Sequence, residues 1–184
     1  MNKADISQLN SHLQEMKNSR IANYAIAGLD SYLIGGGNFG KVRYFECDRN
    51  HQDTITPHSH RFDSMCLVLS GKVVNREWKK TTEDCGDLFA VSKLTYQGRV
   101  GHHEVEHDTY DHFYFVDHVY HEGDMYMMYY DHIHSISFSR DTKVLFFEGP
   151  EITKETVIIE PVVNGEIICT YKNEDWMFLE DEIE

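Results

Sequence analysis

The stretch that decides the fold is TPHSHRFDSMCLVLSG, residues 56–71. It places two histidines, His58 and His60, directly before the apolar run MCLVL at 65–69. A buried imidazole without a polar partner costs about 1–3 kcal/mol, and a metal ion is one such partner. Because alternate residues of a strand point to the same face, two histidines at this spacing reach one ion together. The stretch therefore predicts a strand that begins at a metal site.

The composition predicts one globular domain and excludes several kinds of partner. With 184 residues and 41% hydrophobic residues, the chain has enough apolar material for one core. Its formal charge of −14 repels phosphate backbones and anionic membranes. We therefore expect a small-molecule substrate, with neither nucleic acid nor a membrane as partner.

The cysteine pattern and the absence of long apolar windows predict a cytoplasmic protein. The four cysteines contain no CxxC pair, so we expect reduced thiols instead of a disulfide framework. The N-terminus lacks the apolar stretch of a signal peptide, and no window approaches about 18 consecutive apolar residues.

Short β-branched or aromatic segments separated by turn residues begin at Lys41. The absence of helical patterns between them favours an antiparallel sandwich or barrel. We expect strands near 41–47, 53–58, 62–70, 72–78, 87–95, 112–119, 124–130, 133–138, 143–148, 156–160 and 166–171. The least patterned segment, 98–112, is expected to be a long loop at a rim.

The chain before the barrel has a different pattern. Apolar residues at helical spacing predict an amphipathic helix over 4–18, and a second short helix is expected over 19–28. Glycines at 35–37 and Gly40 are expected to break the chain. We therefore expect a helical extension over 1–40 that packs on the barrel, a barrel over 41–175 and an acidic tail over 176–184. The helical stripe consists of Ile6, Leu9, Leu13 and Met16.

The histidine stretch resembles the first signature of the cupin family, which reads HxH, three or four residues, Glu, six residues, Gly. Here three residues after His60 lead to Ser64 in the glutamate position, and six more lead to Gly71. Offsets of the second cupin signature, counted from Gly123, retain its histidine as His134. The resemblance implies a mainly β antiparallel cupin barrel (a double-stranded β-helix or jelly roll) with a short α-helical N-terminal segment. It also implies that His134 is the third metal ligand.

Other ligands remain open at this stage. His132 lies two residues before His134 and is the alternative third ligand or a group that hydrogen-bonds substrate. Asp63 would complete a site of two histidines and one carboxylate, but strand parity places it on the opposite face unless a bulge intervenes. Glu46 and Glu148 are further candidates for a carboxylate ligand.

Three neutral imidazoles leave the charge of a divalent ion uncompensated, which favours an anionic substrate or a bound hydroxide. Loss of the glutamate ligand resembles the cysteine-dioxygenase type of thiol dioxygenase, which implies one mononuclear Fe(II). Zn, Mn or Ni are alternatives, and the ligands do not choose the metal because imidazole suits iron, zinc, copper and nickel alike. As catalytic residues we expect Arg43 to clamp a substrate carboxylate and Tyr129 to donate a proton.

The sequence therefore predicts an iron-dependent cupin dioxygenase, either a monomer or a homodimer, that acts on a small anionic substrate. One rival is a metal-dependent isomerase, epimerase or lyase that acts on a sugar or keto acid. The other is a cupin that binds a metal or ligand without turnover.

Overall fold

Two antiparallel sheets make up the body of the protein. The computed structural model describes residues 14–37, 40–51, 55–96 and 103–168, of which 14–18 are helical. The strands of this part are β1 (Arg20–Ile21), β2 (Leu29–Gly37), β3 (Gly40–Cys47), β4 (Phe62–Ser70), β5 (Lys72–Thr81), β6 (Asp87–Tyr96), β7 (His103–His121), β8 (Met125–Met128), β9 (Ile133–Phe138), β10 (Lys143–Glu151), β11 (Glu155–Val163) and β12 (Glu166–Ile167). The predicted fold class, a mainly β antiparallel barrel with a short helical segment near the N-terminus, is confirmed.

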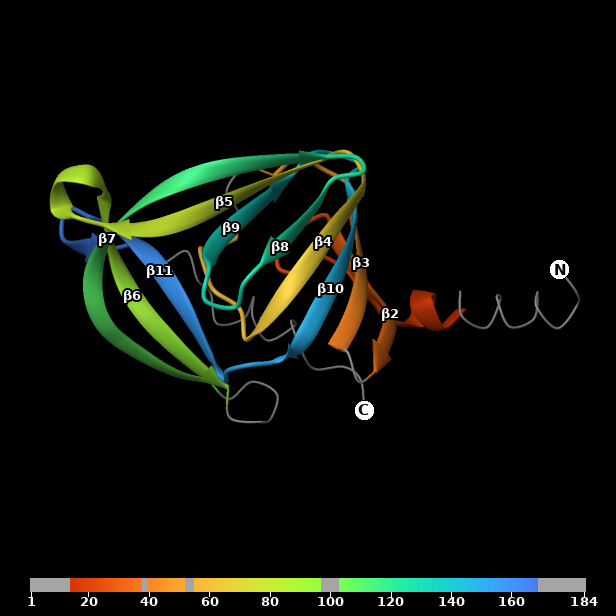
Figure 1. Ribbon diagram of the computed structural model, residues 1–184, viewed down its shortest axis with the longest axis horizontal. Coiled ribbons are helices and arrows are strands. Elements are labelled where there is room, and N and C mark those ends of the chain that lie inside the picture. Colours follow the sequence, from red (N-terminus) through yellow and green to blue (C-terminus); the bar gives the residue numbers. More distant parts are fainter. Residues whose placement is uncertain (1–13, 38–39, 52–54, 97–102, 169–184) are drawn as a thin grey trace, which may run out of the picture.

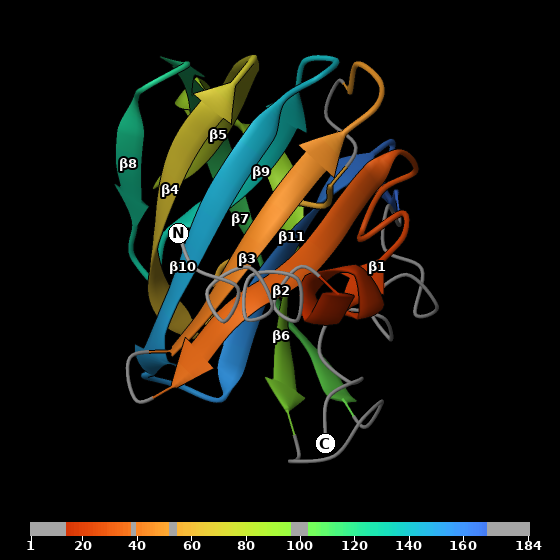
Figure 2. The same cartoon turned by 90° about the vertical axis from the view of Figure 1, so that its right-hand side faces the viewer.

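The first sheet has the strand order β1-β2-β3-β10-β4-β8, and the second has the order β12-β11-β6-β7-β5-β9. Figure 1 shows the first sheet on the right and most of the second sheet on the left, and Figure 2 shows the first sheet face-on. A short 3-10 helix, η1 (Glu83–Cys85), connects β5 and β6.

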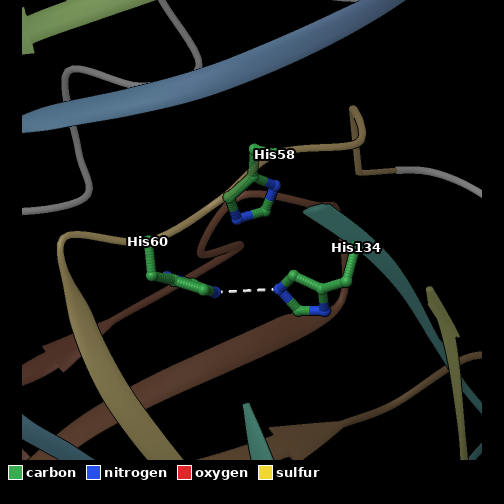
Figure 3. Close-up of side chains that lie close together, drawn as sticks. All are labelled: His58, His60 and His134. Atoms are coloured by element: carbon green, nitrogen blue, oxygen red, sulfur yellow. Dashed lines mark hydrogen bonds between the residues drawn. The ribbon is translucent and has the colours of Figure 1, made fainter. Parts of the chain in front are cut away.

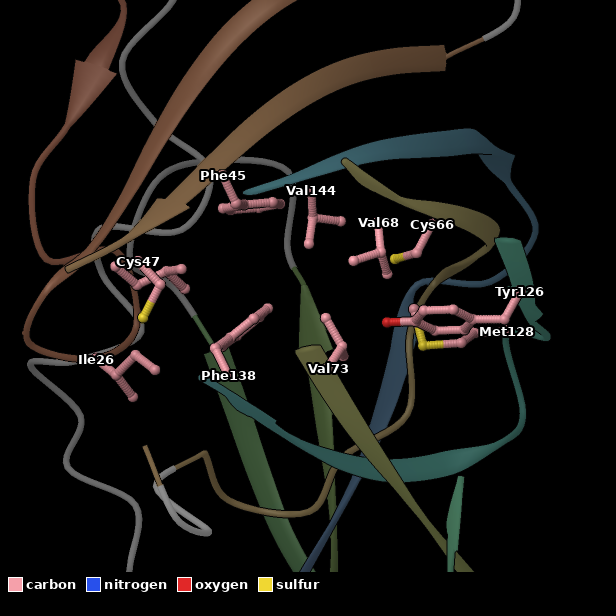
Figure 4. Close-up of a cluster of buried hydrophobic side chains, with 11 residues drawn as sticks. Ile26, Phe45, Cys47, Cys66, Val68, Val73, Tyr126, Met128, Phe138 and Val144 are labelled. Atoms are coloured by element: carbon pink, nitrogen blue, oxygen red, sulfur yellow. The ribbon is translucent and has the colours of Figure 1, made fainter. Parts of the chain in front are cut away.

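The main core fills the space between the two sheets (Figure 4). On β4, Ser64, Cys66 and Val68 are buried, whereas the residues between them are more exposed. This alternation is the two-residue period of a strand with one buried face. The core combines residues of both sheets: Ile26, Leu29, Phe45, Cys47, Cys66, Val68, Val73, Tyr126, Met128, Phe138 and Val144.

The segment before β4 closes the second sheet into a ring. His58 forms antiparallel bridges with His134 of β9 on one side and with Ile158 of β11 on the other. Because β9 and β11 lie near opposite ends of the second sheet, this segment joins them. Part of the segment was expected to be a strand over 53–58, but it contributes only these isolated bridges, and 52–54 lie outside the described residues.

A second, smaller core lies on the other face of this ring. It contains Phe89, Phe113 and Ile159, with Trp78 and Ile133 packed against them. On β9, Ile133 points to this core, whereas His134 shares its face with Phe138 of the main core. The wall formed by β9 therefore has packed side chains on both faces, which fixes the position of His134.

The predicted helix over 19–28 is wrong. Residues 20–21 form β1, and the chain then turns, with Asn23 and Ala25 at positive φ. The Asn23 side chain accepts a hydrogen bond from the Gly28 backbone (2.8 Å), which stabilises the turn instead of a helix. The amphipathic stripe lies mostly in residues 1–13, outside the described residues, as does the predicted tail over 176–184.

The sequence predicted that the glycines at 35–37 and Gly40 break the chain. They belong instead to the hairpin of β2 and β3. A Cβ on Gly40 would overlap the carbonyl oxygen of Glu148 on β10. Gly40 is therefore required for close approach of two backbones, a role that sequence reasoning read as a break.

The predicted rim loop is wrong over 103–112, because β7 already begins at His103, whereas 98–102 lie outside the described residues. Residues 103–113 pair with β6, and residues 112–121 pair with β5. The polar sequence of this segment therefore belongs to one long strand that two partners share in succession.

Two further expectations concern the thiols and membranes. Cys47 and Cys66 are buried free thiols and Cys85 is an exposed one, whereas Cys169 lies outside the described residues. Within the part of the chain that the structure describes, no helix has the length and apolar character needed to cross a membrane.

The turn between β4 and β5 provides a test of the fold. Gly71 has a φ of +79°, and a Cβ there would lie 2.5 Å from Oγ1 of buried Thr142. Gly123 has a similar φ of +88° but has no atom within 4 Å of its Cβ position. We expect Gly71→Ala to lower the free energy of unfolding by at least about 2 kcal/mol, and Gly123→Ala by about 1 kcal/mol. Urea denaturation of both variants measures this difference, and equal losses would contradict the packing of this turn.

Candidate metal centre

Three histidine rings converge on one point between the sheets (Figure 3). His58 and His60 come from the segment before β4, and His134 comes from the start of β9. Each offers a ring nitrogen such that the three atoms lie within 4.8 Å of one another. The ring centroids are 4.9–5.1 Å apart, and the Nε2 atoms of His60 and His134 are 2.8 Å apart. The structure thus brings together the three residues that the sequence suggested as ligands.

The backbone produces this convergence. His58 N lies 2.9 Å from His134 O, and His134 N lies 2.9 Å from His58 O. Two residues that exchange both bonds across an antiparallel pair point their side chains to the same face. His60 follows two residues later and is held by a bond from its N–H to Tyr130 O (3.1 Å).

Two of the three rings are oriented by hydrogen bonds on their far side. His58 Nδ1 lies 2.8 Å from the Thr56 carbonyl oxygen, and His134 Nδ1 lies 2.6 Å from Asn75 Oδ1. Both oxygens are acceptors, so each Nδ1 carries the proton and each Nε2 keeps its lone pair. Histidines that bind metals in proteins are commonly oriented in this way. Nε2 of His58 and of His134 is therefore available to a metal ion, whereas Nε2 of His60 donates its proton to Nε2 of His134 here and would bind the same ion in the other neutral tautomer.

Burial keeps the three imidazoles neutral, which is the form that binds a metal. Desolvation lowers the pKa of His58, and it lowers the pKa of His134 well below its ordinary value. The pKa of His60 is lowered to about 3, mainly by desolvation and further by His58 and Arg61. Protons therefore do not compete with a cation at neutral pH.

The group contains no carboxylate among the described residues. Asp63 points away, as parity predicted, and its Oδ1 accepts a hydrogen bond from the Tyr130 N–H (2.9 Å). Glu46 forms an exposed ion pair with Lys143 (3.5 Å). Three imidazoles without a carboxylate suit iron, zinc, copper and nickel alike.

Two further candidates on the β8–β9 turn lie outside the group of three histidines: His132, the alternative third ligand, and Tyr129, the expected proton donor. His132 is half exposed, and its Nδ1 lies 3.7 Å from Oε1 of Glu77. Tyr129 is 51% exposed and packs its ring against His132 (5.2 Å between centroids). The phenol of β8 that points inward is that of Tyr126, which is buried in the main core.

Arg43 points inward but already has a partner. Its Nε donates to Oε1 of Glu148 at 2.8 Å, and both side chains are largely buried. The guanidinium also lies over the ring of Tyr24. Phe146 is opposite Arg43 in register, and its ring is 6.2 Å from the ring of His60. Phe146 therefore lies between Arg43 and the histidines.

Sequence reasoning missed Asn75 and the pairing of Glu148. Asn75 is a buried polar residue on β5, two positions after Val73 of the main core. The only sign of a special role in the sequence was the place of Asn75 on an apolar strand face. Its connection with His134 follows only from the pairing of β5 with β9.

Comparison with known proteins gives matches only among solved structures. No model of a known protein family matches the chain, and no curated protein sequence matches it. Streptomyces albus HEPD, solved with 2-hydroxyethylphosphonate and Fe(II) bound, is 12% identical over 73% of this chain and 24% of its own, with a TM-score of 0.45. A cupin superfamily protein from Desulfitobacterium hafniense is 13% identical over 67% of this chain and 78% of its own, with a TM-score of 0.39.

Hydroxypropylphosphonic acid epoxidase from S. wedmorenis is 8% identical over 73% of this chain and 57% of its own, with a TM-score of 0.41. Several of the matched structures carry the words cupin or double-stranded β-helix in their names. The matched region spans about a quarter of the Streptomyces albus enzyme.

Two histidines on the same turn and strand provide a matched test of the metal centre. We expect His134→Ala to lower the affinity for a divalent metal at least 100-fold, because one of three ligands is lost. His132→Ala, which removes an exposed ring two residues away, is expected to change the affinity less than twofold. Calorimetric titration of metal-free, untagged protein measures both, and a larger loss in His132→Ala would contradict the assignment.

The lowered histidine pKa values predict a pH dependence of stability. The unfolded chain binds protons at His60 below a pH of about 6.5, whereas the folded chain does so only near pH 3. The metal-free protein therefore loses about 1 kcal/mol of unfolding free energy per pH unit for this residue as the pH falls through that window. We expect His60→Gln to flatten the dependence in urea titrations from pH 7 to pH 4. Parallel curves for the two proteins would contradict a buried neutral His60.

Proposed function

We propose that the chain is a metal-dependent oxygenase that binds one Fe(II) through His58, His60 and His134 and oxidises a small anionic molecule with dioxygen. The observation that carries the proposal is the convergence of three neutral imidazoles in a group to which the described part of the chain adds no carboxylate. The ligands then cancel none of the ion's charge, so an anionic substrate is favoured next to it. Three protein ligands also leave coordination positions open.

Bound Fe(II) would supply the one-electron chemistry that dioxygen requires, which zinc lacks. The protein's own residues would provide a wall of low polarity. The ring of Phe62 is 5.5 Å from that of His60, and Phe146 contacts both rings. Aromatic side chains at this place keep water from the face of His60.

The two expected catalytic residues lie in different surroundings: Arg43 is buried, whereas Tyr129 is exposed. Glu148 accepts from Nε of Arg43, and Ser31 Oγ lies 3.4 Å from its Nη1, so Arg43 would orient a substrate carboxylate with its remaining guanidinium N–H groups. Tyr129 lies on the exposed side of the β8–β9 turn and would donate a proton only to a group that reaches this rim.

Oxygen consumption tests the proposal. Untagged protein is expected to contain one iron per chain and to consume dioxygen when a small anionic thiol such as cysteine is added. His134→Ala should abolish this consumption, and His132→Ala should retain most of it. Turnover by zinc- or manganese-loaded protein without dioxygen would instead indicate an isomerase, epimerase or lyase. Stoichiometric metal without turnover of any tested anion would indicate a binding protein.

A further inference from the structure

The hydroxyl of Ser64 lies inside the protein without a hydrogen-bond partner among the described residues. Ser64 is only 2% exposed, and it shares the inward face of β4 with Cys66 and Val68. A buried hydroxyl without a partner costs about 1–3 kcal/mol, so each one in a folded protein needs an explanation. Alanine or valine would fill this position of a core strand at lower cost.

Ser64 lies beside a buried carboxylate and close to the histidines. Its register partner on β10 is Glu148, and partners across an antiparallel pair place their Cβ atoms about 5 Å apart on one face. Phe62, two residues earlier on the same strand, contacts the ring of His60. One strand period of about 7 Å therefore separates Ser64 from the aromatic wall of the metal centre.

The charges around Ser64 determine what this place would bind. The ion pair of Arg43 with Glu148 (2.8 Å) contributes no net charge. A carboxylate only accepts hydrogen bonds, whereas a hydroxyl both donates and accepts. The Ser64 hydroxyl does not reach Glu148, so a group between them with N–H or O–H bonds would serve both residues. An ammonium group or an alcohol has this chemistry, and a second carboxylate does not.

We propose that Ser64 and Glu148 form a subsite for the alcohol or amine end of a small anion whose anionic end lies at the three-histidine centre. This inference rests on the proposed function, because the anionic end needs the metal. It narrows the substrate class from any small anion to hydroxylated or aminated ones. In this arrangement Arg43 is not the carboxylate clamp; it is a positioning residue, since it holds the Glu148 carboxylate.

Three carboxylates of similar size test the subsite: propionate, 3-hydroxypropionate and β-alanine. Metal-loaded protein is expected to bind at least one of the latter two ten or more times more tightly than propionate, measured by calorimetry. Ser64→Ala and Glu148→Gln should each remove this preference while metal stoichiometry and propionate affinity stay the same. A preference for β-alanine that Glu148→Gln removes identifies an ammonium group, and a preference for 3-hydroxypropionate identifies an alcohol.

A matched control and a second readout separate binding from folding. Ser70→Ala, the same change at the other end of β4, should keep the preference, because the Ser70 hydroxyl bonds Asp141 O (3.0 Å). Ser64→Ala should melt at or above the wild-type temperature without ligand, since it removes an unpaired hydroxyl, and should gain less from added ligand. Equal affinities for the three carboxylates, or a preference that survives both variants, would overturn the subsite alone. Failure to bind metal would overturn the proposed function and the subsite together.

Discussion

The site depends on one short piece of backbone pairing. Two hydrogen bonds of 2.9 Å join His58 to His134, residues that are 76 positions apart in the chain. This bridge aligns their side chains on one face and also joins β9 to the segment that β11 flanks on its other side. Without it, the second sheet would remain open and His134 would have no fixed position relative to His58 and His60.

Burial gives this arrangement its chemical character. The imidazoles remain neutral because solvent is excluded, and two of them are oriented by Thr56 and Asn75. The interior therefore contains polar groups that a purely structural core would avoid, among them the Ser64 hydroxyl, which has no hydrogen-bond partner in the part of the chain that the structure describes. Such groups are understandable where a cation and a polar ligand complete the hydrogen bonding.

Local pattern predicted much of the fold. The bounds of β4 and β9 follow from apolar runs between clear turns, and the parity of β4 correctly placed Asp63 away from the histidines. The predictions over 19–28 and over 103–112 were wrong because pairing with a neighbouring strand overrode the local signal. A polar segment such as the start of β7 becomes a strand when a partner is available.

For the candidate site, the sequence predicted only which three histidines lie together. The HxH spacing and the offset to His134 identified three residues that the structure brings together. The hydrogen-bond partner of Asn75 and the pairing of Arg43 with Glu148 could not be identified from local sequence, since each contact joins distant strands. The role of Arg43 as a carboxylate clamp therefore remains a prediction. The structure adds that Arg43 is already paired with Glu148, so a substrate carboxylate would have to bind beside this pair.

X-ray absorption of the iron-loaded protein tests the central claim most directly. The account predicts three imidazole nitrogens at about 2.0–2.1 Å from one ion, with the remaining scatterers being light atoms of solvent or substrate. One imidazole should disappear in His134→Ala and none in His132→Ala. An unchanged spectrum in His134→Ala, or a first shell with fewer than three imidazoles in the wild type, would contradict it.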